Sequence, residues 1–152
     1  MGPGSVKPRE AKLAHKIGRL VAEYDAVLLT GGMGGVMEEA SRGASEEGGI
    51  VLAICPTYEE RDLNKYVDIP VMTGMKGARN YMNVLSSDVV VAIGYNSAGT
   101  LSEIAFSLQL EKPLIICGAS EAMQKYLKQF KNKQLRFAKD IDGVSKLFKK
   151  LL

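Results

Sequence analysis

The residues best placed to do chemistry lie in two glycine-rich turns, and the first of them is Thr30-Gly31-Gly32-Met33-Gly34-Gly35. It follows an apolar run and precedes a helical pattern. Glycines let the backbone approach a ligand, and the free N–H groups at a helix N-terminus favour an anion. A tight corner without a ligand explains this turn equally well when it is taken alone. The candidate phosphate-binding residues here are Thr30, Gly31, Gly32, Gly34, Gly35 and Val36.

The second turn, Gly94-Tyr95-Asn96-Ser97-Ala98-Gly99-Thr100, also lies between an apolar run and a helical pattern. It offers backbone N–H groups together with hydroxyl and amide side chains. In a parallel sheet all strands end at one edge, and ligands bind in the crevice outside those ends. The two turns therefore predict one pocket for a small molecule that carries a phosphate. The candidate ligand-binding residues of this turn are Gly94, Asn96, Ser97, Gly99 and Thr100.

Two charged residues near these turns are candidates for a chemical role. Arg79 precedes the apolar run that leads to the second turn, where a guanidinium could hold a phosphate with two hydrogen bonds. The alternative is an ordinary surface arginine. Glu103 completes the pattern Thr100-Leu101-Ser102-Glu103, which is typical of a helix capping box. The other interpretation, a carboxylate that faces the crevice, stays open.

The two cysteines point to a structural role. Cys55 and Cys117 each close an apolar run, which predicts buried strand residues. Their spacing indicates neither a zinc site nor a disulfide scaffold, and we expect no metal site and no catalytic triad. A reducing cytoplasm fits this usage best.

The elements that must position the turns alternate between helical patterns and apolar runs, as in βαβ units. Because the strand runs are continuously apolar, we expect an α/β fold of three layers, with a mainly parallel sheet and helices on both faces. No linker or repeat divides the chain, so residues 1–152 are expected to form one domain. Helices are predicted over residues 9–24, 36–47, 76–87, 100–111, 120–131 and 142–152, and strands over 26–30, 50–55, 69–73, 88–93, 114–117 and 134–138.

Composition excludes several classes of protein. The chain has 152 residues, of which 46% are hydrophobic and 24% charged, as is usual for a globular domain. No apolar run is long enough to span a bilayer, and we see no secretion signal, so a cytoplasmic protein without a membrane partner is expected. Lysines crowd the last quarter of the chain, although the net charge is only +3. Without interleaved aromatic residues they indicate a solvated face, and nucleic-acid binding is a distant third possibility.

These residues resemble the Rossmann-like nucleotide-binding superfamily of the LONELY GUY cytokinin-activating phosphoribohydrolases, often labelled lysine decarboxylases. The chain is similar to its small prokaryotic branch, which is related to molybdenum-cofactor carrier proteins. The resemblance implies a Rossmann-like fold, no required cofactor, a bound nucleotide or molybdopterin-type ligand, and a homodimer or homotetramer. The segments that carry it include Thr30-Gly31-Gly32, Gly34-Gly35-Val36-Met37-Glu38, Ala40-Ser41-Arg42-Gly43-Ala44, Ala78-Arg79-Asn80 and Gly99-Thr100-Leu101-Ser102-Glu103.

The phosphoribohydrolases carry the motif P-G-G-x-G-T-x-x-E and an upstream R-K pair. Glu103 and Arg79 match the glutamate and the arginine, so the resemblance implies that an enzyme would use them to cleave an N-glycosidic bond in a nucleoside monophosphate. However, Tyr95-Asn96-Ser97 replaces the proline and glycines, and Asn80 replaces the lysine. The leading hypothesis is therefore a binding or carrier protein for a phosphorylated nucleotide-like or pterin-type molecule, with the phosphoribohydrolase as the alternative.

The start of the chain departs from the superfamily as well. Gly4-Ser5-Val6-Lys7-Pro8 resembles the turn that follows the superfamily's first strand, which makes Gly4 and Ser5 candidate ligand-binding residues. Only three residues precede this turn, so the expected first strand is missing: either the start is truncated or the domain tolerates a short substitute. We therefore expect a groove, or a segment of a partner, where that strand would lie.

Overall fold

The computed structural model describes residues 1–151, and their helices and strands alternate as the sequence predicts. Leu152, at the end of the last predicted helix, lies outside the described residues. In chain order the elements are α1 (Pro8–Glu23), β1 (Leu28–Thr30), α2 (Val36–Glu46), β2 (Val51–Cys55), the 3-10 helix η1 (Glu60–Asp62), β3 (Ile69–Met72), the 3-10 helix η2 (Lys76–Ala78), α3 (Arg79–Leu85), β4 (Val90–Ile93), α4 (Ala98–Gln109), β5 (Leu114–Cys117), α5 (Glu121–Lys128), β6 (Leu135–Ala138) and α6 (Ile141–Leu151).

Within residues 1–151 every strand pair is parallel, as the continuously apolar sequences predict, but the strands form two half-sheets instead of one sheet. One half-sheet has the order β1-β2-β3 and the other β4-β5-β6. In the first, Leu28 of β1 is in register with Val51 of β2, and in the second Val90 of β4 is in register with Leu114 of β5. Both half-sheets send the carboxyl ends of their strands toward the glycine-rich turns.

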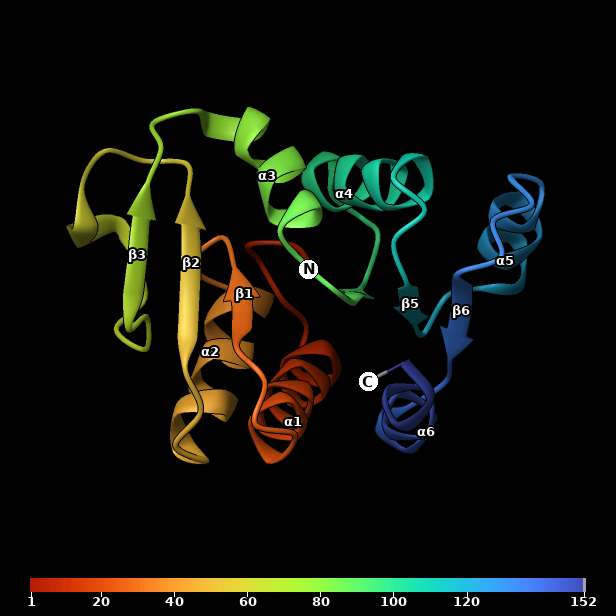
Figure 1. Ribbon diagram of the computed structural model, residues 1–152, viewed down its shortest axis with the longest axis horizontal. Coiled ribbons are helices and arrows are strands. Elements are labelled where there is room, and N and C mark those ends of the chain that lie inside the picture. Colours follow the sequence, from red (N-terminus) through yellow and green to blue (C-terminus); the bar gives the residue numbers. More distant parts are fainter. Residues whose placement is uncertain (152) are drawn as a thin grey trace.

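Helices cover both faces of the strands, which confirms the expected three layers. Helices α1, α2 and α6 lie on one face, and α3 and α4 lie on the other (Figure 1). Successive residues of a strand point to opposite faces. Accordingly Ile115 of β5 belongs to the core under α1 and α6, while its neighbours Leu114 and Ile116 belong to the core under α3, α4 and α5. A strand buried on both faces needs the continuous apolar run seen in the sequence.

Helices α1 and α2 touch through their backbones, because each has a glycine at the crossing. A Cβ atom at Gly18 of α1 would overlap the carbonyl oxygen of Ala40, and one at Gly43 of α2 would overlap the carbonyl oxygen of His15. This contact fixes the position of α2 and, with it, the turn that precedes it.

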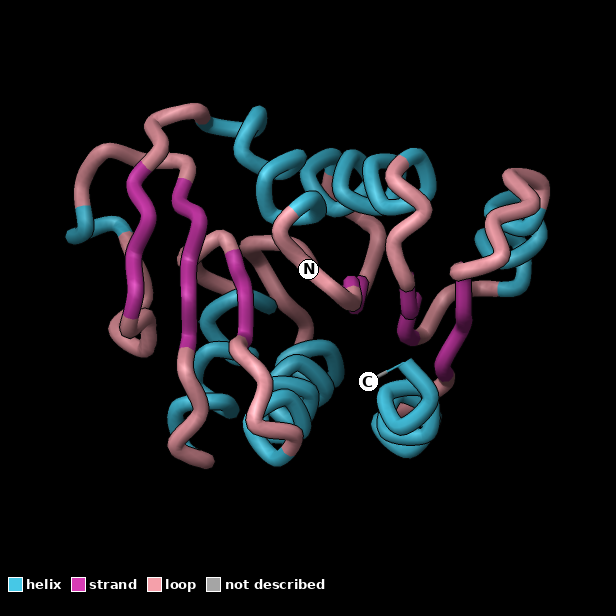
Figure 2. The backbone as a smooth tube through the Cα atoms, in the orientation of Figure 1, coloured by secondary structure: helices cyan, strands magenta, loops and turns pink. Residues whose placement is uncertain are grey.

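The facing edges of β1 and β4 are not joined by a strand formed by any described residue (Figure 2). Residues 1–7 contain no strand. Only Met1 reaches β4: its amino group donates to the Val91 carbonyl, and the Ile93 N–H donates to the Met1 carbonyl at 2.8 Å. A residue of a parallel strand makes these two hydrogen bonds to its neighbour strand, so Met1 pairs with β4 as a single strand residue would. The predicted groove is therefore present.

Candidate functional site

A cavity of about 570 Å³ opens between β1 and β4 and continues to the two glycine-rich turns. The wall of the cavity between the two strands is apolar and includes Ile17, Leu28 and Val91. Polar side chains line the end of the cavity near the glycine-rich turns. The residues predicted from the sequence that line it are Gly4, Thr30, Gly31, Val36, Arg79, Asn80, Ser97, Gly99, Thr100 and Glu103. Residues from both turns thus share one hollow.

Other residues predicted from the sequence do not line this cavity. Gly94 and Asn96 line a second cavity of about 190 Å³, together with Arg9 and Lys139, so the second turn bends between two hollows. The remaining predicted residues that do not line the main cavity are Ser5, Gly32, Gly34 and Gly35.

The N-terminal segment explains why part of the first turn faces away from the cavity. A Cβ atom at Gly35 would overlap the backbone of Gly4, which shows how closely the two segments approach. The Val36 N–H, which the sequence offers to an anion, instead donates to the Pro3 carbonyl at 3.1 Å. The helix N-terminus of α2 is therefore partly satisfied by the chain itself.

The start of the first turn is held by side chains on both of its sides. The Thr30 hydroxyl accepts a hydrogen bond from the Gly32 N–H at 3.1 Å, and the Asn64 amide donates to the Gly32 carbonyl at 3.0 Å. Gly32 has φ +74°, a left-handed conformation that favours glycine. A Cβ atom at Gly31 would overlap the Arg79 guanidinium, so this glycine makes room for a charged side chain.

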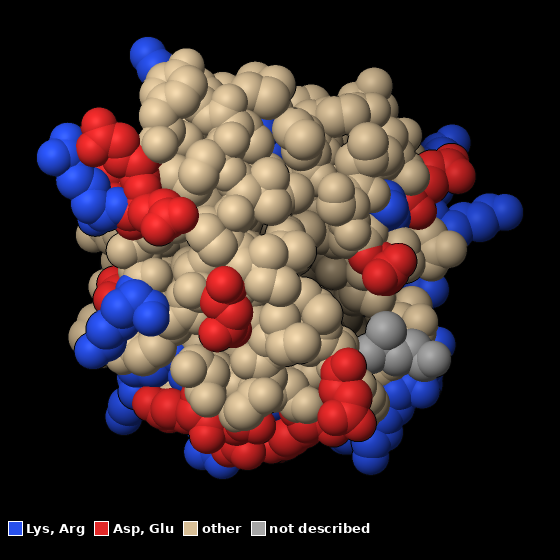
Figure 3. Space-filling model, turned by 60° about the vertical axis from the view of Figure 1, so that its left-hand side comes forward, with Lys and Arg blue, Asp and Glu red and all other residues tan. Residues whose placement is uncertain are grey.

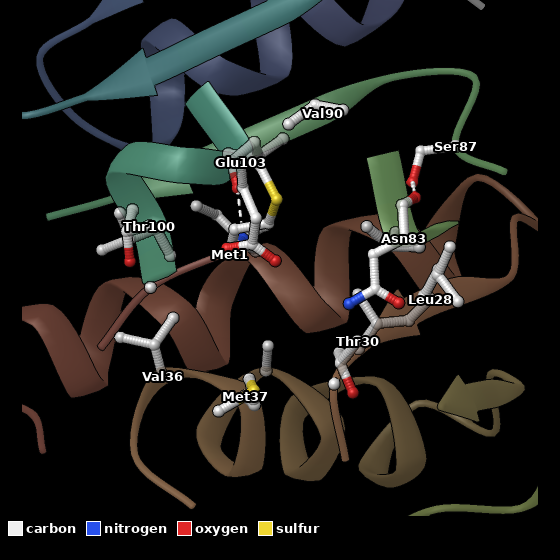
Figure 4. A pocket seen from close by; sticks show the side chains of 18 of the residues that line it. Met1, Leu28, Thr30, Val36, Met37, Asn83, Ser87, Val90, Thr100 and Glu103 are labelled. Carbon is white, nitrogen blue, oxygen red and sulfur yellow. Dashed lines mark hydrogen bonds between the residues drawn. The ribbon is translucent and has the colours of Figure 1, made fainter. Parts of the chain in front are cut away.

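The second turn ends in a serine cap. The Ser97 hydroxyl accepts from the Thr100 N–H at 3.1 Å and pairs with the Thr100 hydroxyl at 2.9 Å. Because Ser97 is the N-cap, α4 begins at Ala98, and Glu103 lies too far into the helix to return to the cap. The capping-box interpretation is therefore wrong. In Figure 4 the Glu103 side chain instead points into the cavity from α4.

Arg79 and Glu103 form a buried pair across the top of the cavity. Their Nη1 and Oε1 atoms are 3.8 Å apart, and the residues are only 8% and 6% exposed. The interpretation of Arg79 as a surface residue is therefore wrong. Burial raises the pKa of Glu103, although the Met1 amino group, Arg79 and the Asn83 amide all act to lower it. Burial lowers the pKa of Arg79, and Glu103 opposes that shift.

Helix α3 contributes two asparagines. The Asn80 amide donates to the Ser102 hydroxyl at 2.9 Å and so links α3 to α4. Asn83 also lines the cavity, is 4% exposed, and has no hydrogen-bond partner for its Oδ1 atom. Asn83 was not among the residues predicted from the sequence, although it stands four residues after Arg79 and therefore on the same helix face.

Both cysteines are buried and free, as expected. Burial raises the pKa of Cys117 to about 11. Among residues 1–151, no group of three or more His, Cys, Asp or Glu side chains is arranged to hold a metal ion. Within the same stretch, no helix has the length and apolar character needed to cross a membrane.

Comparison with known proteins extends over nearly the whole chain. The model of the SLOG cluster4 family (LDcluster4) matches residues 1–144. An uncharacterised protein of Archaeoglobus fulgidus is 40% identical over 126 residues, which are 78% of this chain and 82% of that protein.

Two solved structures are similar in sequence as well as in fold. The molybdenum cofactor binding protein of Rippkaea orientalis is 40% identical, with a TM-score of 0.94 over 99% of this chain and 93% of that one. The molybdenum cofactor carrier protein of Chlamydomonas reinhardtii is 35% identical, with a TM-score of 0.91 over 99% of this chain and 94% of that one.

Proposed function

The chain belongs to the SLOG cluster4 family, and from this membership and its cavity we propose that it binds and carries a phosphorylated pterin-type molecule of the molybdopterin class. The observation that carries the proposal is that residues of both glycine-rich turns line one cavity together with buried polar side chains. Gly31 comes from the first turn, and Ser97, Gly99 and Thr100 come from the second. Two proteins of similar sequence and fold are described as a binding protein and a carrier of the molybdenum cofactor.

The shape of the cavity supports a ligand with an anionic end and a flat apolar body. Hydroxyl and N–H groups of the second turn stand at the carboxyl ends of the strands, where phosphates bind in folds of this type. The apolar wall between β1 and β4 extends from there and gives a ring system a surface to pack on. The absence of a metal-ligand cluster among residues 1–151 is compatible with a ligand held through its organic part.

A second candidate function rests on the Arg79–Glu103 pair. A carboxylate and a guanidinium 3.8 Å apart in a cavity could position water and hold a phosphate, as the phosphoribohydrolase alternative requires. The test is incubation with AMP, with release of adenine and ribose 5-phosphate as the readout. Release that Glu103→Gln abolishes favours the enzyme, whereas release that survives this substitution rules out Glu103 as its catalytic residue.

We also propose that the chain forms a homodimer or homotetramer. Helix α4 has no charged residue other than the buried Glu103, so it lacks the charged face that a helix exposed to water usually carries. In Figure 3 much of the upper face lacks charged side chains. The exposed large apolar side chains of α3 and α4 are Tyr81, Met82, Leu85 and Leu101.

Native mass spectrometry of freshly purified protein tests ligand and assembly together. We expect a folded oligomer that carries the additional mass of a phosphorylated pterin. Gly99→Leu should remove the added mass, because Gly99 lines the cavity and a Cβ atom there meets no other atom closer than 3.8 Å, so a leucine side chain fits and takes space from the ligand. Gly77→Leu is the matched control, since Gly77 is exposed and has open space around it. A ligand-free protein that no phosphorylated pterin or nucleotide stabilises in scanning fluorimetry would contradict the proposal.

A further inference from the structure

The second cavity lies on the other side of the second glycine-rich turn and has a volume of about 190 Å³. It is lined by residues of α1 and by residues at the carboxyl ends of β4, β5 and β6. In folds of parallel strands, ligands bind in the crevice outside those ends. The chemistry of the lining decides what this cavity can bind.

Two cationic side chains from distant parts of the chain meet in this lining. Arg9 comes from the first turn of α1, and Lys139 directly follows the last residue of β6. Neither forms a salt bridge with a carboxylate among residues 1–151. Both are exposed, so a ligand can reach them from solvent. Two cations without an ionic partner in one hollow favour an anionic ligand.

The acidic groups near the cavity are engaged elsewhere. Glu10 lines the cavity, and its Oε2 accepts a hydrogen bond from the Lys7 N–H at 3.2 Å in the cap of α1. Asp140 lies beside the lining, and its Oδ1 accepts from the Gly143 N–H at 3.0 Å in the first turn of α6. The Cys117 thiol is neutral near pH 7, because burial and then Asp140 raise its pKa to about 11. Within the lining, cations therefore outnumber carboxylates.

Two glycines leave the backbone of the cavity open. Gly94 follows β4 and Gly118 follows β5, with φ of +70° and +74°, a conformation that favours glycine. A Cβ atom at Gly118 would meet nothing within 4 Å. The N–H groups of Gly94, Tyr95 and Asn96 donate to no other backbone group of residues 1–151, and these three residues are at least partly accessible. Free backbone N–H groups beside cations are the groups that bind phosphate oxygens.

We infer that the second cavity is a phosphate-binding site, formed by Arg9, Lys139 and the N–H groups of residues 94–96. A phosphate monoester carries a charge of about −1.5 to −2 at pH 7, which the two cations match. The cavity is smaller than the pockets that enclose drug-sized ligands, so its size suits inorganic phosphate or the phosphate group of a small monoester. This inference does not depend on which molecule the main cavity holds.

The second turn separates the two cavities, so each can be tested by itself. Gly94 and Asn96 line the second cavity, whereas Ser97 and Gly99 line the main one. Gly118 lines only the second cavity, and its amide signal can report on a phosphate there.

Amide NMR titrations with inorganic phosphate and with glycerol 3-phosphate test the inference. We expect a saturable shift of the Gly118 signal and no shift of the signal of Gly77, which is exposed with open space around it. Saturation by inorganic phosphate alone identifies the free ion as the ligand. Equal or tighter binding of glycerol 3-phosphate identifies a phosphate monoester.

The double substitution Arg9→Gln and Lys139→Gln should weaken phosphate binding by roughly tenfold or more, because it removes two charged hydrogen-bond donors. Lys12→Gln with Lys16→Gln is the matched control, since it removes the same charge from exposed positions of α1 that do not line the cavity. This control should bind phosphate nearly as the natural chain does. Circular dichroism checks that both double variants are folded.

Glu10→Gln should act in the opposite direction. It removes the carboxylate from the lining and keeps an oxygen that can accept from the Lys7 N–H. We expect phosphate to bind about twofold to fivefold more tightly to this variant, because a nearby like charge is lost.

A Gly118 signal that responds to neither probe, or that responds alike in the two double variants, overturns the inference. Gly99→Leu should retain the response, since Gly99 does not line the second cavity, and loss of the response in this variant would instead assign the phosphate to the main cavity. These outcomes do not decide the proposed function, which depends on the co-purified mass.

Discussion

Gly31 shows how one residue without a side chain can set the position of a charged group far along the sequence. The Arg79 guanidinium occupies the space that a Cβ atom at Gly31 would need. This close approach holds Arg79 over the cavity and toward Glu103. The glycine is thus required by packing against α3, in addition to any contact of its own backbone with a ligand.

Gly31→Ala should therefore weaken ligand binding more than it weakens folding. The overlapping atoms belong to the flexible end of Arg79, which can move aside at little cost to the fold. We expect at least a tenfold loss of affinity for the co-purified ligand, or about 1.4 kcal/mol, measured by titration. The melting temperature of the ligand-free protein should hardly change. Gly77→Ala, in open space on η2, serves as the control and should bind normally.

The burial of Glu103 predicts a specific dependence of stability on pH. Because burial raises the pKa of Glu103 in the folded chain, the folded protein binds more protons there than the unfolded chain does between pH 4.5 and the raised pKa. The contribution of Glu103 to stability is complete below pH 4.5 and is lost as the pH rises through the folded pKa.

Glu103→Gln removes this titration, so its melting temperature should rise relative to that of the natural chain as the pH is raised from about 4 to about 7. Thermal unfolding followed by circular dichroism measures the difference. Glu23→Gln, at an exposed position of α1, is the control. A constant difference between Glu103→Gln and the natural chain over this range would show that Glu103 is not held in a desolvated state.

At the scale of elements, the crossing of α1 and α2 depends on reciprocal glycines. Inside a helix, alanine is normally more stabilising than glycine by about 1 kcal/mol. At Gly18 and Gly43 the added methyl group would instead overlap a backbone carbonyl of the facing helix, which cannot move without separating the two helices. Packing therefore overrides helix propensity at this crossing.

Gly18→Ala should destabilise the protein by about 1–3 kcal/mol, the usual cost of overpacking. The measurement is the free energy of unfolding in urea. Ser45→Ala, at an exposed position of α2, should leave stability nearly unchanged or raise it slightly. If Gly18→Ala proves as stable as Ser45→Ala, the backbone contact between α1 and α2 is looser than the structure shows.

For the whole molecule, the groove between the half-sheets is the dominant feature. The edges of β1 and β4 carry unpaired backbone groups, which otherwise serve as templates for another strand. Met1 already makes the two hydrogen bonds of a parallel ladder with Val91 and Ile93 of β4. Residues joined ahead of Met1 in an extended conformation would continue along the groove, whose wall is apolar.

A chain extended ahead of Met1 by Val-Ile-Val-Ile-Val should be more stable than one extended by Gly-Ser-Gly-Ser-Gly. Both extensions displace the buried amino group, so their difference reports strand formation alone. We expect the apolar extension to melt at least about 3 °C higher, which is roughly 1 kcal/mol for a chain of this length. Amide exchange of β1 and β4 should slow as well. Equal melting temperatures would mean that the groove does not accept a strand.

The type and order of the elements and the class of the fold follow from patterns in the sequence alone. Short continuous apolar runs such as residues 114–117 are typical of strands buried on both faces, and the two glycine-rich turns mark where two of these strands end. The apolar runs and the turns are local patterns, so they can be recognised without knowing how the rest of the chain packs.

Which of the turn residues share a cavity depends on how the chain packs in three dimensions. Pro3 and Gly4 cover part of the first turn, the second turn bends between two hollows, and α4 starts early enough to send Glu103 into the cavity instead of back to its cap. Asn83 became visible as a site residue only through its burial and its unused oxygen. Each of these facts depends on contacts between residues distant in the chain, which no local pattern encodes.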